Sequence, residues 1–192
     1  APLDDAQHAE HAVCAAIEMQ AAMTALSVSL QARGLPAIAM RIGIHTGRVV
    51  VGNIGSHSRF SYTVIGDAVN LAARLEGANK AFGTGILLSD ATAVQLSREL
   101  GLRHLDTVVV KGKSAAVKVY TPCPDDRLCA LSRRAVAQFY GQTWEASASD
   151  FVALLSVKPR DPAALRFLER IEARRSQSTD GTVIAPLSLD KL

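Results

Sequence analysis

The chain has 192 residues, of which 48% are hydrophobic and 20% are charged, and its formal net charge is +3. This size can bury the core of one domain with an appended segment, and the small, dispersed charge excludes a dominant nucleic-acid-binding surface. Cys14, Cys123 and Cys129 are odd in number and form no CxxC pair. We therefore expect no disulfide framework, no structural zinc site and a reducing, cytoplasmic location.

The N-terminal segment carries no recognisable targeting signal. We find no apolar run near about 18 residues and no basic-then-apolar order typical of a signal peptide. We therefore expect a soluble segment without membrane contact, and leave open a membrane-anchored parent protein. The chain has no initiator Met, and Ala1-Pro2-Leu3 is typical of the interior of a longer protein.

The first half of the chain predicts one long helix followed by short strands. The Ala-rich amphipathic pattern from Gln7 to about Ala32 predicts the helix. Ile38 to His45 and Arg48 to Ile54 are β-prone runs separated by Thr46-Gly47, which predicts an antiparallel hairpin. Phe60 to Ile65 predicts a further short extended piece.

The middle of the chain mixes helices with paired strands. Asp67 is an expected N-cap for a helix from Ala68 to about Phe82, which Gly83 ends. Ile86 to Leu88 predicts a strand, and Ser89 or Asp90 can cap a helix that reaches Leu100. Two strands follow, over Leu102 to Val110 and Val117 to Tyr120. This mixture indicates an α+β sandwich rather than a doubly wound sheet.

A boundary is predicted at Thr121-Pro122-Cys123-Pro124, because two prolines interrupt any regular element. It divides the chain into residues 1–122 and 123–192. The second part predicts three helices, which resemble one tetratricopeptide-like unit, at Leu128 to Tyr140, Trp144 to Ser156 and Asp161 to Arg175. An irregular tail follows, with a short extended piece at Thr182 to Ile184.

Two polar groupings are candidate phosphate sites. At about 100° per residue, Asp67, Asn70 and Arg74 share one narrow arc of a helix. An amide beside a guanidinium suits charge that develops on a transferring phosphoryl group, although such a stripe is more often a solvated helix face. Lys111 and Lys113 flank a glycine in a turn, which can bind phosphate or be merely solvated. We assign no catalytic or metal-binding role to His45.

Two long motifs resemble the class III adenylate and guanylate cyclases. They are MRIGIHTGRVVVGNIG, from Met40 to Gly55, and YTVIGDAVNLAARLE, from Tyr62 to Glu76. They stand in the family's order and spacing, and the match extends through Val110-Lys111-Gly112-Lys113 to cover roughly residues 1–122. The resemblance implies a ferredoxin-like cyclase sandwich, incomplete at its N-terminus, followed by the helical extension.

The resemblance also implies roles for five residues. Asn70 and Arg74 match the pair that stabilises the transition state as the ribose 3′-oxygen attacks the α-phosphate. Arg41 and Lys111 match the cations that hold the outer phosphates. Thr63 stands at the position that contacts the purine edge, where threonine favours ATP over GTP. The helix-face pattern and the resemblance thus select the same two catalytic side chains.

In the family, the two metal-binding Asp residues lie in strands before the long helix, and the resemblance implies that this chain begins after them. The resemblance implies two divalent cations, Mg²⁺ or Mn²⁺, whose ligands we expect to be absent here, because the adjacent Asp4 and Asp5 are poor substitutes. It also implies a homodimer with active sites at the interface. We therefore expect negligible cyclase activity from these residues alone.

Two other functions stay open. A catalytically silent cyclase-homology module would bind nucleotide or a sister domain for regulation; the intact Asn70 and Arg74 count against it, and the missing carboxylates leave it possible. An interaction scaffold built on the helices after Pro124 is the weaker alternative, because one helix pair with a single Trp offers little exposed groove.

Overall fold

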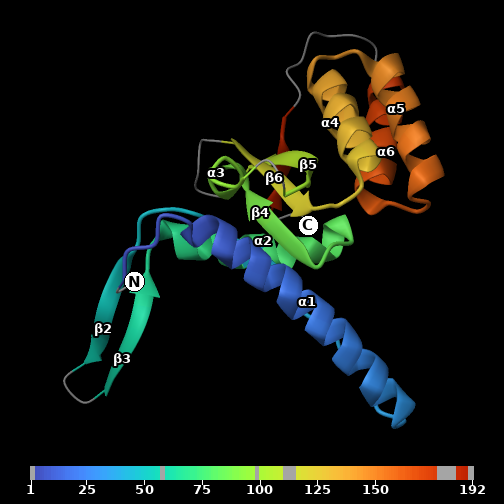
Figure 1. The fold of residues 1–192 in the computed structure, drawn as a ribbon. Coiled ribbons are helices and arrows are strands. Elements are labelled where there is room, and N and C mark those ends of the chain that lie inside the picture. Colours follow the sequence, from blue (N-terminus) through green and yellow to red (C-terminus); the bar gives the residue numbers. More distant parts are fainter. Residues whose placement is uncertain (1–2, 57–58, 98–99, 110–115, 177–184, 190–192) are drawn as a thin grey trace.

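The computed structural model describes residues 3–56, 59–97, 100–109, 116–176 and 185–189. A central sheet carries a helix on each face, a β-hairpin projects from one end, and a three-helix bundle stands at the other (Figure 1). In chain order the elements are α1 (His8–Ala32), β1 (Ile42–Ile44), β2 (Val50–Ser56), β3 (Arg59–Ile65), α2 (Asp67–Phe82), β4 (Ile86–Ser89), α3 (Asp90–Ala93), β5 (Leu102–Val109), β6 (Ala116–Pro122), α4 (Asp126–Tyr140), α5 (Trp144–Val157), α6 (Pro162–Ser176) and β7 (Leu187–Ser188).

The main sheet has the strand order β1-β4-β6-β5-β7. β1 is parallel to β4 and β7 is parallel to β5, whereas β6 is antiparallel to both of its neighbours. This mixed sheet, covered by helices, confirms the predicted α+β class.

Alternation along β4 fixes which helix covers which face. Leu87 packs in a core cluster with Leu71, Leu75 and Phe82 of α2. Ile86 and Leu88 point to the opposite face, where they cluster with Ala16 of α1. Successive strand residues face opposite sides, so β4 separates two hydrophobic layers.

The predicted hairpin between residues 38–45 and 48–54 is wrong. β1 pairs with β4 instead, with Gly43 opposite Leu87, and β2 forms its hairpin with β3. The reason is a close approach of β1 to α2: a Cβ built on Gly43 would lie 2.1 Å from the carbonyl oxygen of Ala72. Glycine lets the strand lie directly on the helix, a role often signalled by a glycine inside a strand pattern.

Two further boundaries differ from expectation. α2 begins at Asp67, with Gly66 at its N-cap, so Asp67 is the first helical residue rather than the cap. The helix expected from residue 90 to 100 ends at Ala93. Beyond α3 the chain contacts α1 instead: Glu10 accepts hydrogen bonds from the backbone N–H and the hydroxyl of Ser97. The extended piece expected at 182–184 lies outside the described residues.

The helical extension, α4 to α6, has a core of its own. Phe139, Phe151 and Phe167 pack with Leu154 and Ile171, and Phe151 and Phe167 stack with ring centroids 4.6 Å apart. The three helices confirm the predicted helical run, whereas the tetratricopeptide likeness and the division at residue 122 stay predictions.

Two ion pairs and the returning strand β7 connect this extension to the sheet. Arg103 of β5 forms a buried ion pair with Asp161, which directly precedes α6, and Asp106 of β5 pairs with Arg170 of α6. After α6 the chain returns to the sheet, where β7 pairs with β5 and Leu189 is buried in the α2 core cluster.

Helix α1 is long and apolar enough, by length and composition only, to cross a membrane, with a mean hydropathy of 1.5 over its best window. This corrects the expectation that no such segment exists. Core helices and signal sequences pass the same test, so it assigns no membrane contact by itself. Ala9, Val13 and Ala16 of α1 are buried, whereas Ile17, Leu26 and Val28 are exposed.

Candidate functional site

Helix α2 carries the two predicted catalytic side chains. Leu71, Leu75 and Phe82 anchor it in the core and are almost fully buried. Asn70 is exposed and Arg74 is partly buried, so both lie off that buried face. Residues four apart are neighbours on a helix surface. The amide and the guanidinium therefore occupy neighbouring positions on α2, and their catalytic role stays a prediction.

The hairpin leads directly into α2 and carries Thr63. Thr63 of β3 is exposed and stands opposite Gly52 of β2 in the register. β3 ends at Ile65, two residues before α2 begins. Because the connection is so short, the end of the hairpin lies next to the N-terminal end of α2. Thr63 and Asn70 therefore lie on two adjoining elements.

Arg41 is held beside α2 by a carboxylate that sequence reasoning did not identify. Its Nε lies 3.3 Å from Oε1 of Glu76, and the two side chains are 46% and 47% exposed. Glu76 is two residues beyond Arg74 on α2. An ion pair this exposed contributes about 1 kcal/mol or less, so a bound polyphosphate can compete with Glu76 for Arg41. Lys111 lies outside the described residues.

Asn79 fixes α2 against β1 and was also missed. Its side-chain amide is fully buried and donates to the carbonyl oxygen of Ile42 at 2.9 Å. Its oxygen accepts a hydrogen bond from the Thr84 hydroxyl at 2.8 Å. An asparagine on the apolar side of an amphipathic helix is the signal that could have identified it, because buried amides need partners.

His45 forms a contact within the sheet, and the absence of a chemical role for it stays a prediction. Its Nδ1 lies 2.7 Å from the hydroxyl oxygen of Ser89, and the neighbouring Thr46 hydroxyl lies 3.1 Å from that of Thr92. These contacts join the end of β1 to the end of β4 and the start of α3. They stiffen the sheet edge next to the segment that leads into the hairpin.

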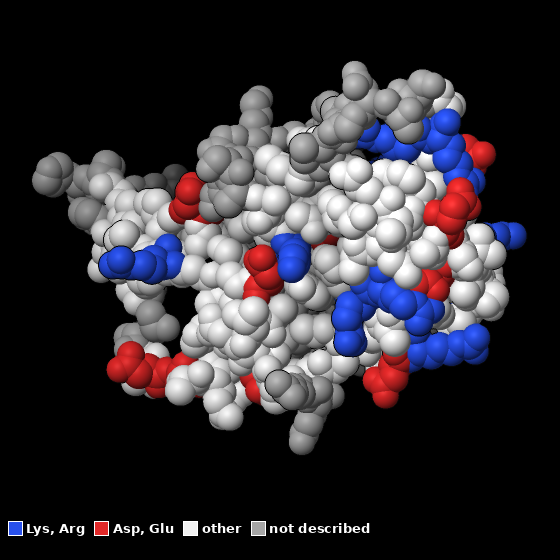
Figure 2. Space-filling view, turned by 90° about the horizontal axis from the view of Figure 1, so that it is seen from above, with Lys and Arg blue, Asp and Glu red and all other residues white. Residues whose placement is uncertain are grey.

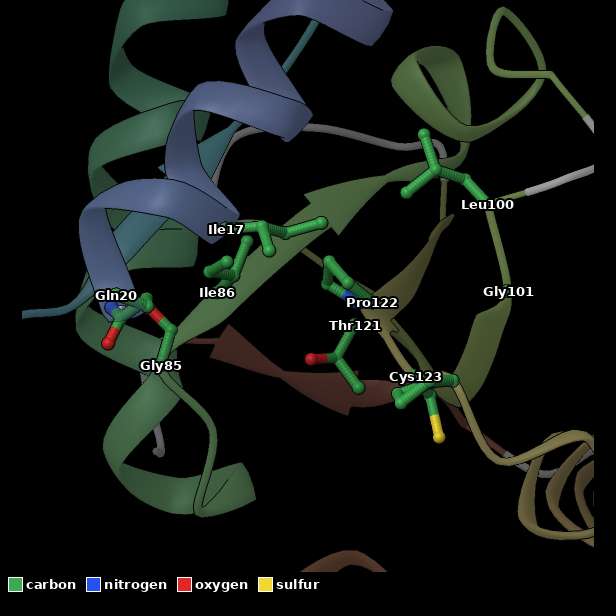
Figure 3. A pocket seen from close by; sticks show the side chains of 10 residues that line it. Ile17, Gln20, Gly85, Ile86, Leu100, Gly101, Thr121, Pro122 and Cys123 are labelled. Carbon is green, nitrogen blue, oxygen red and sulfur yellow. Dashed lines mark hydrogen bonds between the residues drawn. The ribbon is translucent and has the colours of Figure 1, made fainter. Parts of the chain in front are cut away.

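A pocket of about 500 Å³ lies on the other face of the sheet, against α1. Ile17 and Gln20 border it on one side, Ile86 lies at its floor, and Pro122 and Cys123 close the far end (Figure 3). None of Thr63, Asn70 and Arg74 lines it, so it is not the candidate nucleotide site.

The surface charges alternate in sign on the face shown in Figure 2. On the face shown in Figure 2, Lys and Arg side chains lie in separate groups with Asp and Glu beside them, rather than in one basic surface. In the part of the chain that the structure describes, no group of three or more His, Cys, Asp or Glu residues could hold a metal ion. Among the described residues, none is therefore assigned as a ligand of the two divalent cations that the resemblance implies.

Asn70 and Arg74 on one helix, next to a β-hairpin and packed on an α+β sheet, are the arrangement expected of a class III cyclase domain. Residues 3–121 match the family model of the adenylate and guanylate cyclase catalytic domain. The chain belongs to this family.

Two curated relatives give the scale of the similarity. The chain is 43% identical over 120 residues to adenylate cyclase 1 of Rhizobium meliloti and 42% identical over 125 residues to an adenylate cyclase of Anabaena cylindrica. Each match covers 62% of this chain, but only 18% and 25% of the relatives' lengths.

A solved structure is similar over the same region. The adenylyl cyclase CyaB from P. aeruginosa is 36% identical, with a TM-score of 0.51, over 58% of this chain and 56% of that one.

Proposed function

We propose that this chain forms part of an adenylate cyclase, which converts ATP to 3′,5′-cyclic AMP and pyrophosphate, and that it contributes Asn70 and Arg74 to the active site. The observation that carries the proposal is the position of these two side chains, one helical turn apart on α2, off the face that anchors the helix. The names of the Rhizobium and Anabaena relatives support ATP as the substrate.

Arg74 and Asn70 suit the charge that develops during cyclisation. In this reaction the 3′-oxygen forms a bond to the α-phosphorus while the bond from that phosphorus to the pyrophosphate oxygen breaks. Negative charge accumulates on the oxygens around the phosphorus, where the planar fork of Arg74 can donate two hydrogen bonds. The Asn70 amide adds a neutral donor. Both groups sit on a helix whose opposite face is locked in the core, so little reorganisation is needed.

Substrate binding falls to residues around this pair. Thr63 offers a hydroxyl for the purine edge, and its position on the exposed hairpin leaves that hydroxyl accessible. Arg41 adds a fixed cation for the outer phosphates, since Glu76 holds it only through an exposed ion pair. Lys111 would add a second cation.

The metal ligands form the second part of the proposal. Two divalent cations, when bound, would activate the 3′-hydroxyl and neutralise the phosphates, and we propose that carboxylates outside these 192 residues hold them. A homodimer would bring those carboxylates to Asn70 and Arg74 of the partner copy. The three cysteines are free, which agrees with a cytoplasmic location.

The test compares Arg74→Ala with Lys80→Ala in the protein with its upstream segment restored. Lys80 is an exposed cation on the same helix, so its replacement controls for charge and helix propensity. If Arg74 acts on the transition state, kcat and kcat/KM for cyclic AMP formation should both fall on the order of 10²- to 10³-fold. Lys80→Ala should leave both unchanged. An unchanged rate in Arg74→Ala would remove Arg74 from the mechanism.

The 192-residue chain alone provides a second measurement. It should form negligible cyclic AMP, and the upstream segment should restore the activity. A restored protein that binds ATP but forms no cyclic nucleotide would instead identify a silent regulatory module.

A further inference from the structure

Helix α6 of the helical extension packs on the C-terminal end of α2. Ala163, in the first turn of α6, is buried in the same core cluster as Phe82 and Leu75 of α2. Gly83 ends α2 in the left-handed conformation with φ 63°, and a Cβ placed there would lie 2.8 Å from Cγ of Pro162. The start of α6 therefore rests directly on the residue that ends the catalytic helix.

Arg166 of α6 caps α2 from outside the helix. Its Nη2 donates a 2.7 Å hydrogen bond to the carbonyl oxygen of Ala81, and its guanidinium carbon lies 5.1 Å from the centroid of the Phe82 ring. The last four carbonyls of a helix have no partner within it, and the negative end of the helix dipole favours a cation there. Arg166 supplies both the donor and the charge.

The Arg166 guanidinium caps α2 although burying this charged group is unfavourable. Burial lowers the pKa of Arg166 from its ordinary value, and its Nη1 is buried without a hydrogen-bond partner among the described residues. A neutral side chain would avoid both penalties. The position of the guanidinium is thus specific to the carbonyl and the ring at the end of α2.

The rest of α6 is fixed to the sheet on both sides of Arg166. Asp161, directly before α6, accepts two 2.7 Å hydrogen bonds from the buried Arg103 of β5. Arg170, four residues after Arg166 and on the same face, pairs with Asp106 of β5 at 3.0 Å. Because α6 is held at both points, Arg166 can transmit the position of the helical extension to α2.

We propose that Arg166 is a positioning residue for the cyclase reaction, through which the helical extension holds the helix that carries Asn70 and Arg74. This inference rests on the proposed function of those two residues. Ala81 lies seven residues beyond Arg74, about 10 Å along the helix axis. A shift or fraying at the capped end would therefore reach Arg74, and a displacement of about 1 Å can lower a rate 100-fold.

The test uses Arg166→Met, because methionine keeps an apolar stem on Phe82 and removes the unpaired donor, so the fold should persist. Arg134→Met is the matched control: Arg134 pairs with Asp150 inside the helical extension, away from α2, and its own side chain is 59% exposed. In the protein with its upstream segment, Arg166→Met should lower kcat about 10- to 100-fold with KM for ATP unchanged. Arg166→Lys should recover most of the rate, and Arg134→Met should match the wild type.

Amide hydrogen exchange on the 192-residue chain separates this inference from the proposed function. Amides in the last turn of α2 should exchange faster in Arg166→Met and at the wild-type rate in Arg134→Met. Unchanged exchange in Arg166→Met, or faster exchange with unchanged kcat, would overturn the positioning role. A wild-type protein without cyclase activity would contradict the proposed function, while the exchange result would still decide whether Arg166 restrains α2.

Discussion

The buried ion pair between Arg103 and Asp161 should dominate the attachment of the helical extension. We consider Asp161→Asn, which keeps the size of the side chain and its ability to accept from the backbone N–H of Ala164, at 3.0 Å in the wild type. Asparagine is a good N-cap, so α6 should still begin normally. The substitution removes mainly the negative charge that faces Arg103.

The expected loss follows from burial. The side chains of Arg103 and Asp161 are 2% and 0% exposed. Burial alone would raise the pKa of Asp161, but the hydrogen bonds and charge of Arg103, with Ala164 and Lys158, lower it to about 2. Against the ordinary value of 3.8 this corresponds to about 2 kcal/mol. Leaving Arg103 buried and unpaired adds to it, so the total should be about 3 kcal/mol, near the lower end for broken buried pairs.

Urea unfolding followed by tryptophan fluorescence is the assay. The single Trp, Trp144, packs edge-on against Phe139 in the helical extension, with ring centroids 5.4 Å apart, and therefore reports unfolding of that part. Asp150→Asn is the control: the side chain of Asp150 is 12% exposed but that of its partner Arg134 is 59% exposed, so this substitution should cost less than Asp161→Asn. The slope of the transition should stay constant in both variants.

A loss below about 1 kcal/mol in Asp161→Asn, equal to that of Asp150→Asn, would refute the argument. The double variant Arg103→Met/Asp161→Leu should regain much of the loss, because it leaves no unpaired buried charge. The pKa of Asp161 is lower in the folded protein than in the unfolded chain. The carboxylate therefore contributes fully to the free energy of unfolding above pH 3.8, and this contribution is lost as the pH falls toward 2. The difference between wild type and Asp161→Asn should shrink over that range.

Three further outcomes are expected. Burial lowers the pKa of His104 from 6.5 to about 4, so the unfolded chain takes up a proton at a higher pH than the folded protein does. The free energy of unfolding should therefore fall by up to about 3 kcal/mol as the pH is lowered from 6.5 to 4. In urea unfolding at several pH values, His104→Gln should flatten this dependence. Gly43→Ala should destabilise the fold by several kcal/mol, on the order of an overpacked core, whereas Gly77→Ala, with open space around it, should stabilise α2 by about 0.5–1 kcal/mol in thermal unfolding. Thr63→Ala should reduce the ratio of kcat/KM for ATP to that for GTP.

Local patterns predicted most of the helices, and the positions of Asn70 and Arg74 on α2, from the sequence alone. The apolar spacing from residue 68 to 82 gave α2 within one residue, and the same spacing placed Asn70 and Arg74 on a common face. Such calculations depend only on the helical period, which is fixed by the backbone. The long cyclase motifs then supplied chemical roles that periodicity cannot supply.

Strand pairing could not be obtained in the same way. β1 finds its partner in β4, more than 40 residues away, through a parallel connection that includes α2. A two-residue turn signal at Thr46-Gly47 favours a local hairpin, but it carries no information about the close approach at Gly43. The contacts of Glu10 with Ser97 and of Arg166 with Ala81 are likewise long-range, and no local pattern indicates them.

The return of the chain to the sheet at β7 limits how the three-helix bundle can move. The bundle leaves the sheet directly after β6 and is followed by a strand that pairs with β5, so it is tethered at two points of one sheet. The bundle is also held to β5 by the ion pairs of Arg103 with Asp161 and of Arg170 with Asp106. A signal that rotates the bundle away from the sheet would therefore have to break these ion pairs, and one that also draws β7 off β5 would expose Leu189.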